Sequence, residues 1–247
     1  MEVHQEKGKI LVNQRKFSSE LLVKFSMEGC SPVDTPSSPG IKLIKEDGQP
    51  KVDAQAYRSL IGSLLYLCAT RPDISFTVNL LSRFMQSPSE IHLRSAKRVL
   101  RYIQGTLDLG ILYSRGTTHL VGYSDADWAG SDEEMRSISG NCFTLGSGVI
   151  TWFSKKQTVV AQSTAEAEYV ALAKCANQAV WLRKVMADLM VPQTSPTTIF
   201  CDNKAAIAIV KNPVLHDRTK HFKIKFHAIR QLQLEGEIKV DFCSTDD

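Results

Sequence analysis

The sequence predicts an α/β domain in its second half, preceded by a mostly helical region that opens with a β-hairpin. In the second half, short apolar runs that alternate like strands are interleaved with helical patterns. In the first half, three helical patterns follow one another with no strand pattern between them. The pattern changes at residues 114–119, so we expect two domains, 1–118 and 119–247.

The composition excludes several classes of protein. With 247 residues, 43% hydrophobic and 23% charged, the chain is globular. A formal net charge of +4 is too small to prove a nucleic-acid partner. No run of residues is long and apolar enough for a membrane span or a signal peptide. The six cysteines form no Cys-x-x-Cys pair and suit buried thiols. An intracellular protein is expected, cytoplasmic or nuclear and not secreted, with no membrane partner.

The first domain reads as a hairpin followed by helices. Residues 2–13 alternate around a glycine turn, and residues 18–29 predict a short helix that ends at Gly29. A connector with four prolines follows, over residues 31–54. Helical patterns then cover 57–69 and 73–85.

The next helix has the clearest signals. Ser87 and Glu90 fit a capping box with Pro88 at the first helical position, and Gly105 can end the helix. Its apolar stripe consists of Leu93, Ala96, Val99, Leu100 and Ile103. The arginines Arg94, Arg98 and Arg101 share another face. A solvated face is the favoured interpretation, and a phosphate-facing stripe is the alternative.

The second domain alternates strands and helices. The expected strands are 119–124, 139–145, 149–154, 197–201 and 239–243. Residues 146–148, Gly-Ser-Gly, predict a hairpin turn. Helices are expected over 164–189 and 204–211.

Two strands of this domain lead directly into a carboxylate. Asp125 follows one apolar run and Asp202 another. In an open α/β sheet, the carboxyl ends of the strands form the edge where ligands bind. Aspartate also ends strands and starts helices, and this structural explanation is favoured for either residue taken singly. Asp127 repeats two residues after Asp125, so both side chains could point to one site.

A third acid lies in the long helix. Ser163 and Glu166 fit a capping box, which explains Glu166 structurally. Glu168 lies inside the helix on a packed face, where a carboxylate is costly unless something positive meets it. Three acids in one pocket repel by about 4 kcal/mol per pair at 4 Å and an effective dielectric near 20. A divalent cation relieves this repulsion, and oxygen ligands favour Mg²⁺ or Mn²⁺ over zinc.

Several long blocks resemble one family, in the family's order. "YSDADWAG", "VAQSTAEAEYVALA", "IFCDNKAAIAIVKNP" and "HDRTKHFKIKFHAIR" are similar to the ribonuclease H domain of copia-type LTR retrotransposon Pol polyproteins. Upstream, "YRSLIGSLLYLCATRPDISFTVNLLSRFM" and "AKRVLRYIQGTLDLGILY" resemble the segment between polymerase and ribonuclease H, so residues 1–118 correspond to a reverse transcriptase thumb or connection region. The similarity covers nearly the whole chain.

The resemblance implies a fold, an activity and a site. The fold is a ribonuclease H-like domain, a five-stranded mixed sheet flanked by helices. The activity is hydrolysis of the RNA strand of RNA–DNA hybrids with two Mg²⁺ or Mn²⁺ ions. By motif, Asp125, Glu168 and Asp202 are the catalytic and metal-binding residues. Asp127 is not part of this set, and its spacing from Asp125 leaves it as a neighbouring support or as a residue that forms the turn. Implied partners are the hybrid and the polymerase part of the polyprotein.

Two departures from the family pattern qualify the expected activity. The family's last strand is followed by a helix with a fourth carboxylate, whereas this sequence stops at "STDD". Asp246 or Asp247 could replace that acid, but a solvated tail is the favoured interpretation. The only Asp-Asp pair is the terminal one, so a polymerase active site is not expected.

The basic stretch near the end predicts a nucleic-acid contact. Its candidate phosphate-binding residues are Arg218, Lys220, His221, Lys223, Lys225 and Arg230. On charge alone, a solvated helix face is equally compatible. Two alternatives to an active nuclease stay open: an inactive remnant that at most binds nucleic acid, and a protein-interaction role for the helices of 1–118.

Overall fold

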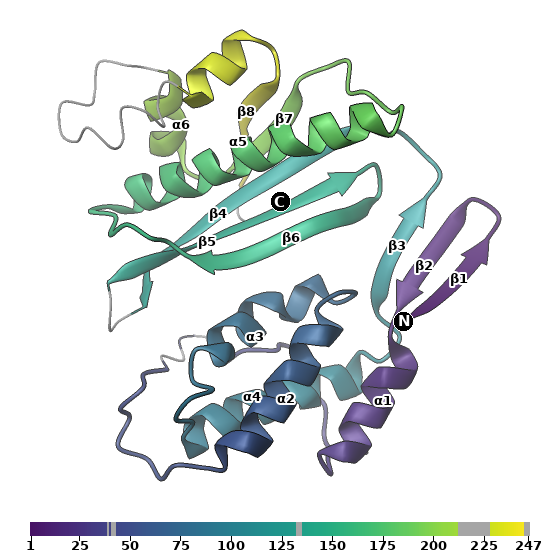
Figure 1. The fold of residues 1–247 in the computed structure, drawn as a ribbon, viewed down its shortest axis with the longest axis vertical. Helices are drawn as coiled ribbons and strands as arrows, with labels where there is room; N and C mark the ends of the chain where they lie inside the picture. Colours follow the sequence, from purple (N-terminus) through teal and green to yellow (C-terminus); the bar gives the residue numbers. More distant parts are fainter. Residues whose placement is uncertain (39, 41–42, 132–134, 212–227, 245–247) are drawn as a thin grey trace. The chain divides into compact units, whose positions relative to one another are not determined.

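The computed structural model describes residues 1–247 apart from 39, 41–42, 132–134, 212–227 and 245–247. It divides into two compact units, Met1–Ser114 and Arg115–Asp247 (Figure 1). In the described part of the chain, no helix combines the length and the apolar character that a membrane crossing needs.

The first unit contains a small antiparallel sheet. Its strands are β1 (Glu2–Glu6), β2 (Lys9–Asn13) and β3 (Gly110–Ser114), in the order β1-β2-β3. Gly8 makes the hairpin turn with a φ of 78°, a conformation that glycine adopts without a steric penalty. The hairpin was expected from the sequence. Strand β3 was not expected, because it pairs with β2, about 100 residues earlier in the sequence, and such a distant partner leaves no local signal.

Four α-helices make up the rest of the first unit. They are α1 (Arg15–Lys24), α2 (Ala54–Leu67), α3 (Ser75–Ser82) and α4 (Glu90–Gly105), with a 3₁₀ turn at Pro72–Ile74. Their apolar faces enclose one core, which includes Tyr57, Leu64, Val78 and Val99, all fully buried. The predicted apolar stripe of α4 faces this core, with Leu93 at its partly buried edge.

Two details of these helices differ from the prediction. Helix α1 begins earlier than expected, and it ends earlier because Ser26, with a φ of 55°, takes a conformation that a helix cannot continue. The capping box of α4 uses Ser89 as the N-cap, with His92 in the third helical position. Pro88 therefore precedes the cap and is not the first helical residue.

Arg71 is buried in the first unit, and its guanidinium is bound on two sides. The guanidinium of Arg71 is bound on one side by Asp73, with Nε and Nη2 donating to the carboxylate at 3.0 Å and 2.7 Å. On the other side it donates to the carbonyl and hydroxyl oxygens of Thr106. The Tyr102 hydroxyl donates to the same carboxylate at 2.9 Å. This network joins the 3₁₀ turn to the end of α4.

The second unit is built on a mixed five-stranded sheet of order β6-β5-β4-β7-β8. The strands are β4 (Leu120–Ser131), β5 (Arg136–Leu145), β6 (Gly148–Lys156), β7 (Thr197–Cys201) and β8 (Ile238–Phe242). The first three are antiparallel, and β7 and β8 run parallel to β4. The predicted turn lies between β5 and β6, where Gly146 has a φ of 60°.

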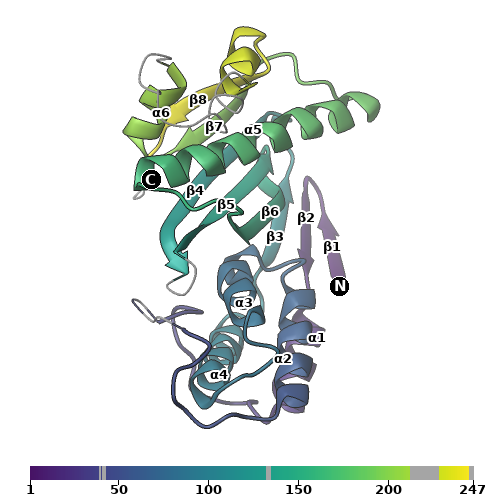
Figure 2. The ribbon, with the colours of Figure 1, turned by 60° about the vertical axis from the view of Figure 1, so that its left-hand side comes forward.

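Helix α5 (Thr164–Asp188) lies along one face of this sheet, as both views in Figures 1 and 2 show. Its buried side packs with α6 (Lys204–Lys211) on Phe143, Ile199 and Val240 of three strands. Residues 228–234 form a further helical segment. The mixed five-stranded sheet flanked by helices, predicted from the sequence, is confirmed.

Candidate active site

Two aspartates lie level with each other on neighbouring parallel strands: Asp125 lies within β4, which continues beyond it, and Asp202 directly follows the end of β7. The register of β4 with β7 pairs Ser124 with Cys201. Asp125 and Asp202 are the next residues on their strands, and adjacent strands lie about 4.8 Å apart. The parallel pairing thus brings together two carboxylates from distant parts of the sequence.

The structure removes the helix-start explanation for Asp202. The N-cap side chain of α6 is Asn203, whose Oδ1 accepts a hydrogen bond from the Ala206 amide at 2.9 Å. Asp202 precedes this cap, between the end of β7 and the cap residue. Its position is therefore set by the strand, at the sheet edge near Asp125.

Glu168 approaches the same edge from α5. Ser163 caps this helix by accepting a hydrogen bond from the Glu166 amide, as predicted. Glu166 itself is partly exposed and accepts from the Gln162 amide. Glu168, two residues further, is only 6% exposed. Its Oε1 accepts from the Ala126 amide of β4 at 3.1 Å, which fixes the carboxylate beside the residue that follows Asp125.

The second oxygen of Glu168 is buried and has no hydrogen-bond partner among the described residues. Ligand atoms of Glu168, Cys201 and Asp202 lie within 4.8 Å of one another. Burial raises the pKa of Glu168 to about 8, and the negative charges of Asp125 and Asp202 contribute, against the Ala126 amide. A carboxyl group in this state is stabilised by any added positive charge.

Asp125 lies close enough to Glu168 and Asp202 for their charges to interact. Partial desolvation raises its pKa, and the charges of Asp202 and Asp127 raise it further, while the Ala126 amide opposes them. Asp125 and Asp127 therefore share one electrostatic environment, as their spacing predicts. Asp127 is the last residue of β4 in register with β5 before the strand pairing becomes irregular.

The donor set fits a hard divalent cation. Asp125, Glu168 and Asp202 offer carboxylate oxygens, which Mg²⁺ and Mn²⁺ prefer, and one buried oxygen has no partner. Cys201 is close but suits a metal less well, because burial raises the pKa of its thiol to about 12 and keeps it protonated. The residues present therefore fit Mg²⁺ or Mn²⁺ better than zinc.

Two contributors to the site were not predicted from the sequence. The Ala126 amide is a backbone donor, for which a sequence offers no signal. The thiol of Cys201 is the last buried position of the strand before Asp202, and strand alternation from Ile199 could have placed it there. Close by, Trp128 Nε1 donates to the Ala161 carbonyl at 3.2 Å and joins β4 to the segment before α5.

Most of the predicted nucleic-acid contacts lie outside the described residues: Arg218, Lys220, His221, Lys223 and Lys225. The two terminal aspartates, Asp246 and Asp247, also lie outside them. Arg230 is described and is exposed on the helical segment 228–234. It keeps the surface position that a phosphate contact requires.

Comparison with known proteins identifies the family. The retrovirus-related Pol polyprotein from transposon RE1 of Arabidopsis thaliana is 42% identical over 237 residues, 96% of this chain. The Pol polyprotein from transposon TNT 1-94 of Nicotiana tabacum is 35% identical over 97% of it. The chain belongs to the Pol polyproteins of copia-type retrotransposons. It spans only about a sixth of their length, 16% and 18%.

Other comparisons concern shorter proteins and solved structures. Secreted RxLR effector protein 161 of Plasmopara viticola is 49% identical over 51% of this chain and 90% of its own. No protein-family model matches the chain. Among solved structures, the foamy viral protease-reverse transcriptase in complex with dsDNA matches 99% of this chain and 45% of its own, at 11% identity and a TM-score of 0.50. The second unit of this Pol-family chain is a ribonuclease H-like domain.

Proposed function

We propose that the second unit is a metal-dependent ribonuclease H that hydrolyses the RNA strand of RNA–DNA hybrids within a retrotransposon Pol protein. One observation carries the proposal: Glu168 of a helix and Asp202 after a strand lie within ligand distance of each other, and Asp125 of the neighbouring strand is close enough for its charge to act on both. Glu168 is buried there with one oxygen unpartnered. Repulsion between such acids destabilises the fold unless a cation neutralises their charge. Acids with shifted pKa values at the ligand-binding edge of a sheet are typical of catalytic sites.

The three acids share one role in this proposal, and neighbouring groups support them. Asp125, Glu168 and Asp202 would hold one or two Mg²⁺ or Mn²⁺ ions. A bound divalent ion supplies a Lewis acid that lowers the pKa of water and stabilises the leaving oxygen of a phosphodiester. The Ala126 amide holds Glu168 in place through Oε1, which leaves Oε2 without a partner among the described residues and available to a cation. Asp127 would act as a support by adding negative charge beside Asp125.

Substrate binding is assigned to the basic stretch. Arg230 is exposed, and the five basic residues upstream of it, with the same expected role, extend the charge. Positive side chains contact phosphates without reading the base sequence, which suits a nuclease that acts on a hybrid duplex. The proposed substrate class is therefore the RNA–DNA hybrid. An intracellular location is a prediction from the sequence.

The first unit is proposed as the connection-like region ahead of the nuclease, with the polymerase part of a Pol protein as its partner. This rests on the family and on the order of the sequence blocks. No polymerase chemistry is assigned to it.

The test is cleavage of a labelled RNA–DNA hybrid by the purified chain, in Mg²⁺ and separately in Mn²⁺. We expect metal-dependent cutting of the RNA strand, lost in Asp125→Asn. Glu166→Gln is the matched control, because it changes a partly exposed acid on the same helix, two residues from Glu168, and should cut like the parent. A folded parent chain that cuts in neither metal would contradict the proposal and leave a non-catalytic nucleic-acid-binding protein as the better account.

A further inference from the structure

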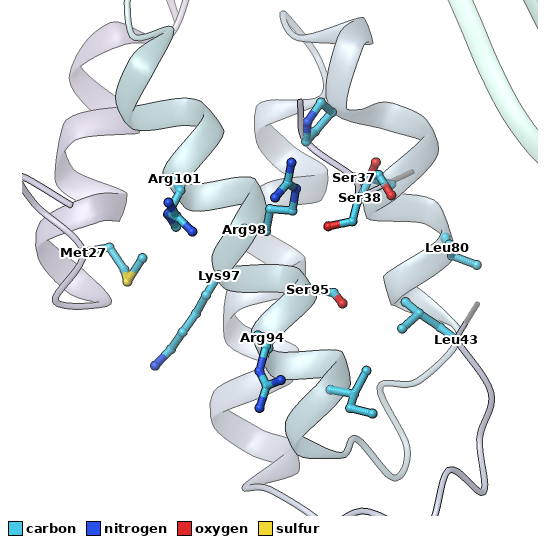
Figure 3. A pocket seen from close by; sticks show the side chains of 13 residues that line it. Met27, Ser37, Ser38, Leu43, Leu80, Arg94, Ser95, Lys97, Arg98 and Arg101 are labelled. Carbon is cyan, nitrogen blue, oxygen red and sulfur yellow. The ribbon is translucent and has the colours of Figure 1, made fainter. Parts of the chain in front are cut away.

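The first unit contains a cavity whose charged residues are all basic. It has a volume of about 580 Å³, within the range of small-molecule sites. The arginine-bearing face of α4 lines it, together with connector residues 36–38 and 43, and Met27 and Leu80 also contribute to the lining. Figure 3 shows Arg94, Lys97, Arg98 and Arg101 projecting from α4. None of the described residues that line the cavity is acidic.

Arg98 and Arg101 each donate a hydrogen bond to the connector and keep further N–H groups that can bind a ligand. Arg98 donates through Nη2 to the Thr35 hydroxyl at 2.8 Å, and its Nε is buried with no partner among the described residues. Arg101 donates through Nε to the Ser31 carbonyl at 2.8 Å. In both cases the partner is a neutral oxygen of the connector. The positive charges therefore stay uncompensated in the described part of this wall, unlike that of Arg71.

The spacing of these side chains indicates more than one anionic group. Arg94 and Arg101 are separated by about 10 Å along the helix axis, at 1.5 Å per residue. A single phosphate is too small to reach both. Arginine binds phosphate oxygens through paired N–H donors, and Ser37, Ser38 and Ser95 add hydroxyl groups.

The rest of the lining is apolar. Pro36, Leu43, Leu80 and Ile91 offer surfaces for an uncharged, planar or hydrophobic group. We infer that this basic cavity binds a ligand with two or more phosphates joined to an apolar part. A nucleic-acid strand and a nucleoside polyphosphate share this chemistry. The inference concerns the first unit alone and does not depend on nuclease activity in the second.

The experiment measures binding in EDTA, so that no cleavage occurs. The probes are a 5′-labelled single-stranded 12-mer oligonucleotide and a fluorescent ATP analogue, followed by anisotropy. A triple variant, Arg94→Gln, Arg98→Gln and Arg101→Gln, should weaken binding of at least one probe by tenfold or more, since each charged contact is worth about a factor of ten. Loss for the oligonucleotide identifies a strand as the ligand, and loss for the ATP analogue identifies a nucleotide.

Two further proteins keep the test sharp. Lys7→Gln, Lys9→Gln and Lys16→Gln together remove the same charge from exposed positions away from the cavity and should bind like the parent. Ser38→Glu places a carboxylate in the cavity without touching α4 and should also weaken binding. Circular dichroism checks that each variant is folded.

Three outcomes would overturn the inference. In the first, the arginine variant binds both probes as tightly as the parent does. In the second, the lysine control loses as much affinity as the arginine variant. In the third, inorganic tripolyphosphate displaces the probes as well as the unlabelled oligonucleotide or ATP does. That result would show that the apolar part adds nothing.

Discussion

The two units treat buried charge in opposite ways. In the first, Arg71 is 3% exposed at its side chain and is surrounded by Asp73, Thr106 and, through Asp73, Tyr102. In the second, Glu168 is nearly as buried, yet the charges that act on it are those of Asp125 and Asp202, and one of its oxygens has no partner among the residues that the structure describes. A closed network, in which each charge is paired, stabilises the fold, whereas an open cluster of like charges favours the binding of a cation. The contrast separates a structural site from a functional one.

The largest expected effect breaks the open cluster. Glu168→Gln keeps the shape and the bond to the Ala126 amide but removes the charge. We expect hybrid cleavage to fall by more than about a hundredfold, beyond the loss typical of residues one step removed from a metal. Initial rates in Mg²⁺ and Mn²⁺ measure this, with Glu166→Gln as the matched control. Cleavage within threefold of the parent would exclude Glu168 from the chemistry.

The next effect breaks the closed network. Asp73→Asn leaves the Arg71 guanidinium without its counter-charge, so we expect the free energy of unfolding to fall by roughly 2–4 kcal/mol. Asp108→Asn is the control, since it removes an exposed ion pair with Arg15 and should cost at most about 1 kcal/mol. Urea unfolding at neutral pH compares the two variants. Equal losses would show that burial of Arg71 has no energetic consequence.

The closed network also predicts a pH effect. Burial raises the pKa of Asp73, but the Arg71 and Tyr102 contacts outweigh it and hold the pKa below its usual 3.8. Its contribution to stability is therefore present above about pH 3.8 and is lost as the pH falls further. The parent should lose this part of its stability in acid, and Asp73→Asn should not.

The open cluster predicts the opposite dependence. The pKa of Glu168 is raised from 4.5 to about 8, so the folded state keeps its proton and the metal-free protein loses stability as the pH rises through this window. In EDTA at pH 8.5, Glu168→Gln should be more stable than the parent by on the order of 1–4 kcal/mol, and at pH 4 the difference should vanish. A difference that stays constant between these two pH values would contradict the assignment.

The smallest effect is the response to added cation. Mg²⁺ or Mn²⁺ at ten times its dissociation constant should stabilise the parent by about 1.4 kcal/mol at pH 8. Asp202→Asn should lose this response, and Asp73→Asn should keep it. Thermal unfolding with and without the ion measures the shift. The same response in both variants would move the cation site away from the carboxylate cluster.

Much of the second unit could be predicted from the sequence because its signals are local. The alternation of the strands and the capping pair Ser163 and Glu166 both depend on nearby residues. The identity of the helix cap that frees Asp202 did not follow from the pattern, since both Asp202 and Asn203 can cap a helix. In the first unit, the pairing of β3 with β2 joins the two ends of the unit and has no local signal. The capping box of α4 was placed two residues early because Ser87 and Ser89 are chemically equivalent caps.

The register between β4 and β7 has a kinetic consequence. Asp125 and Asp202 become neighbours only when β7 pairs in parallel with β4. These strands are far apart in the sequence, and α5 lies between them. Contacts of such long sequence separation form slowly, because the entropy of closing the loop is lost before the pairing contributes. Cation affinity during refolding should therefore appear with the last folding phase, after helix formation is complete.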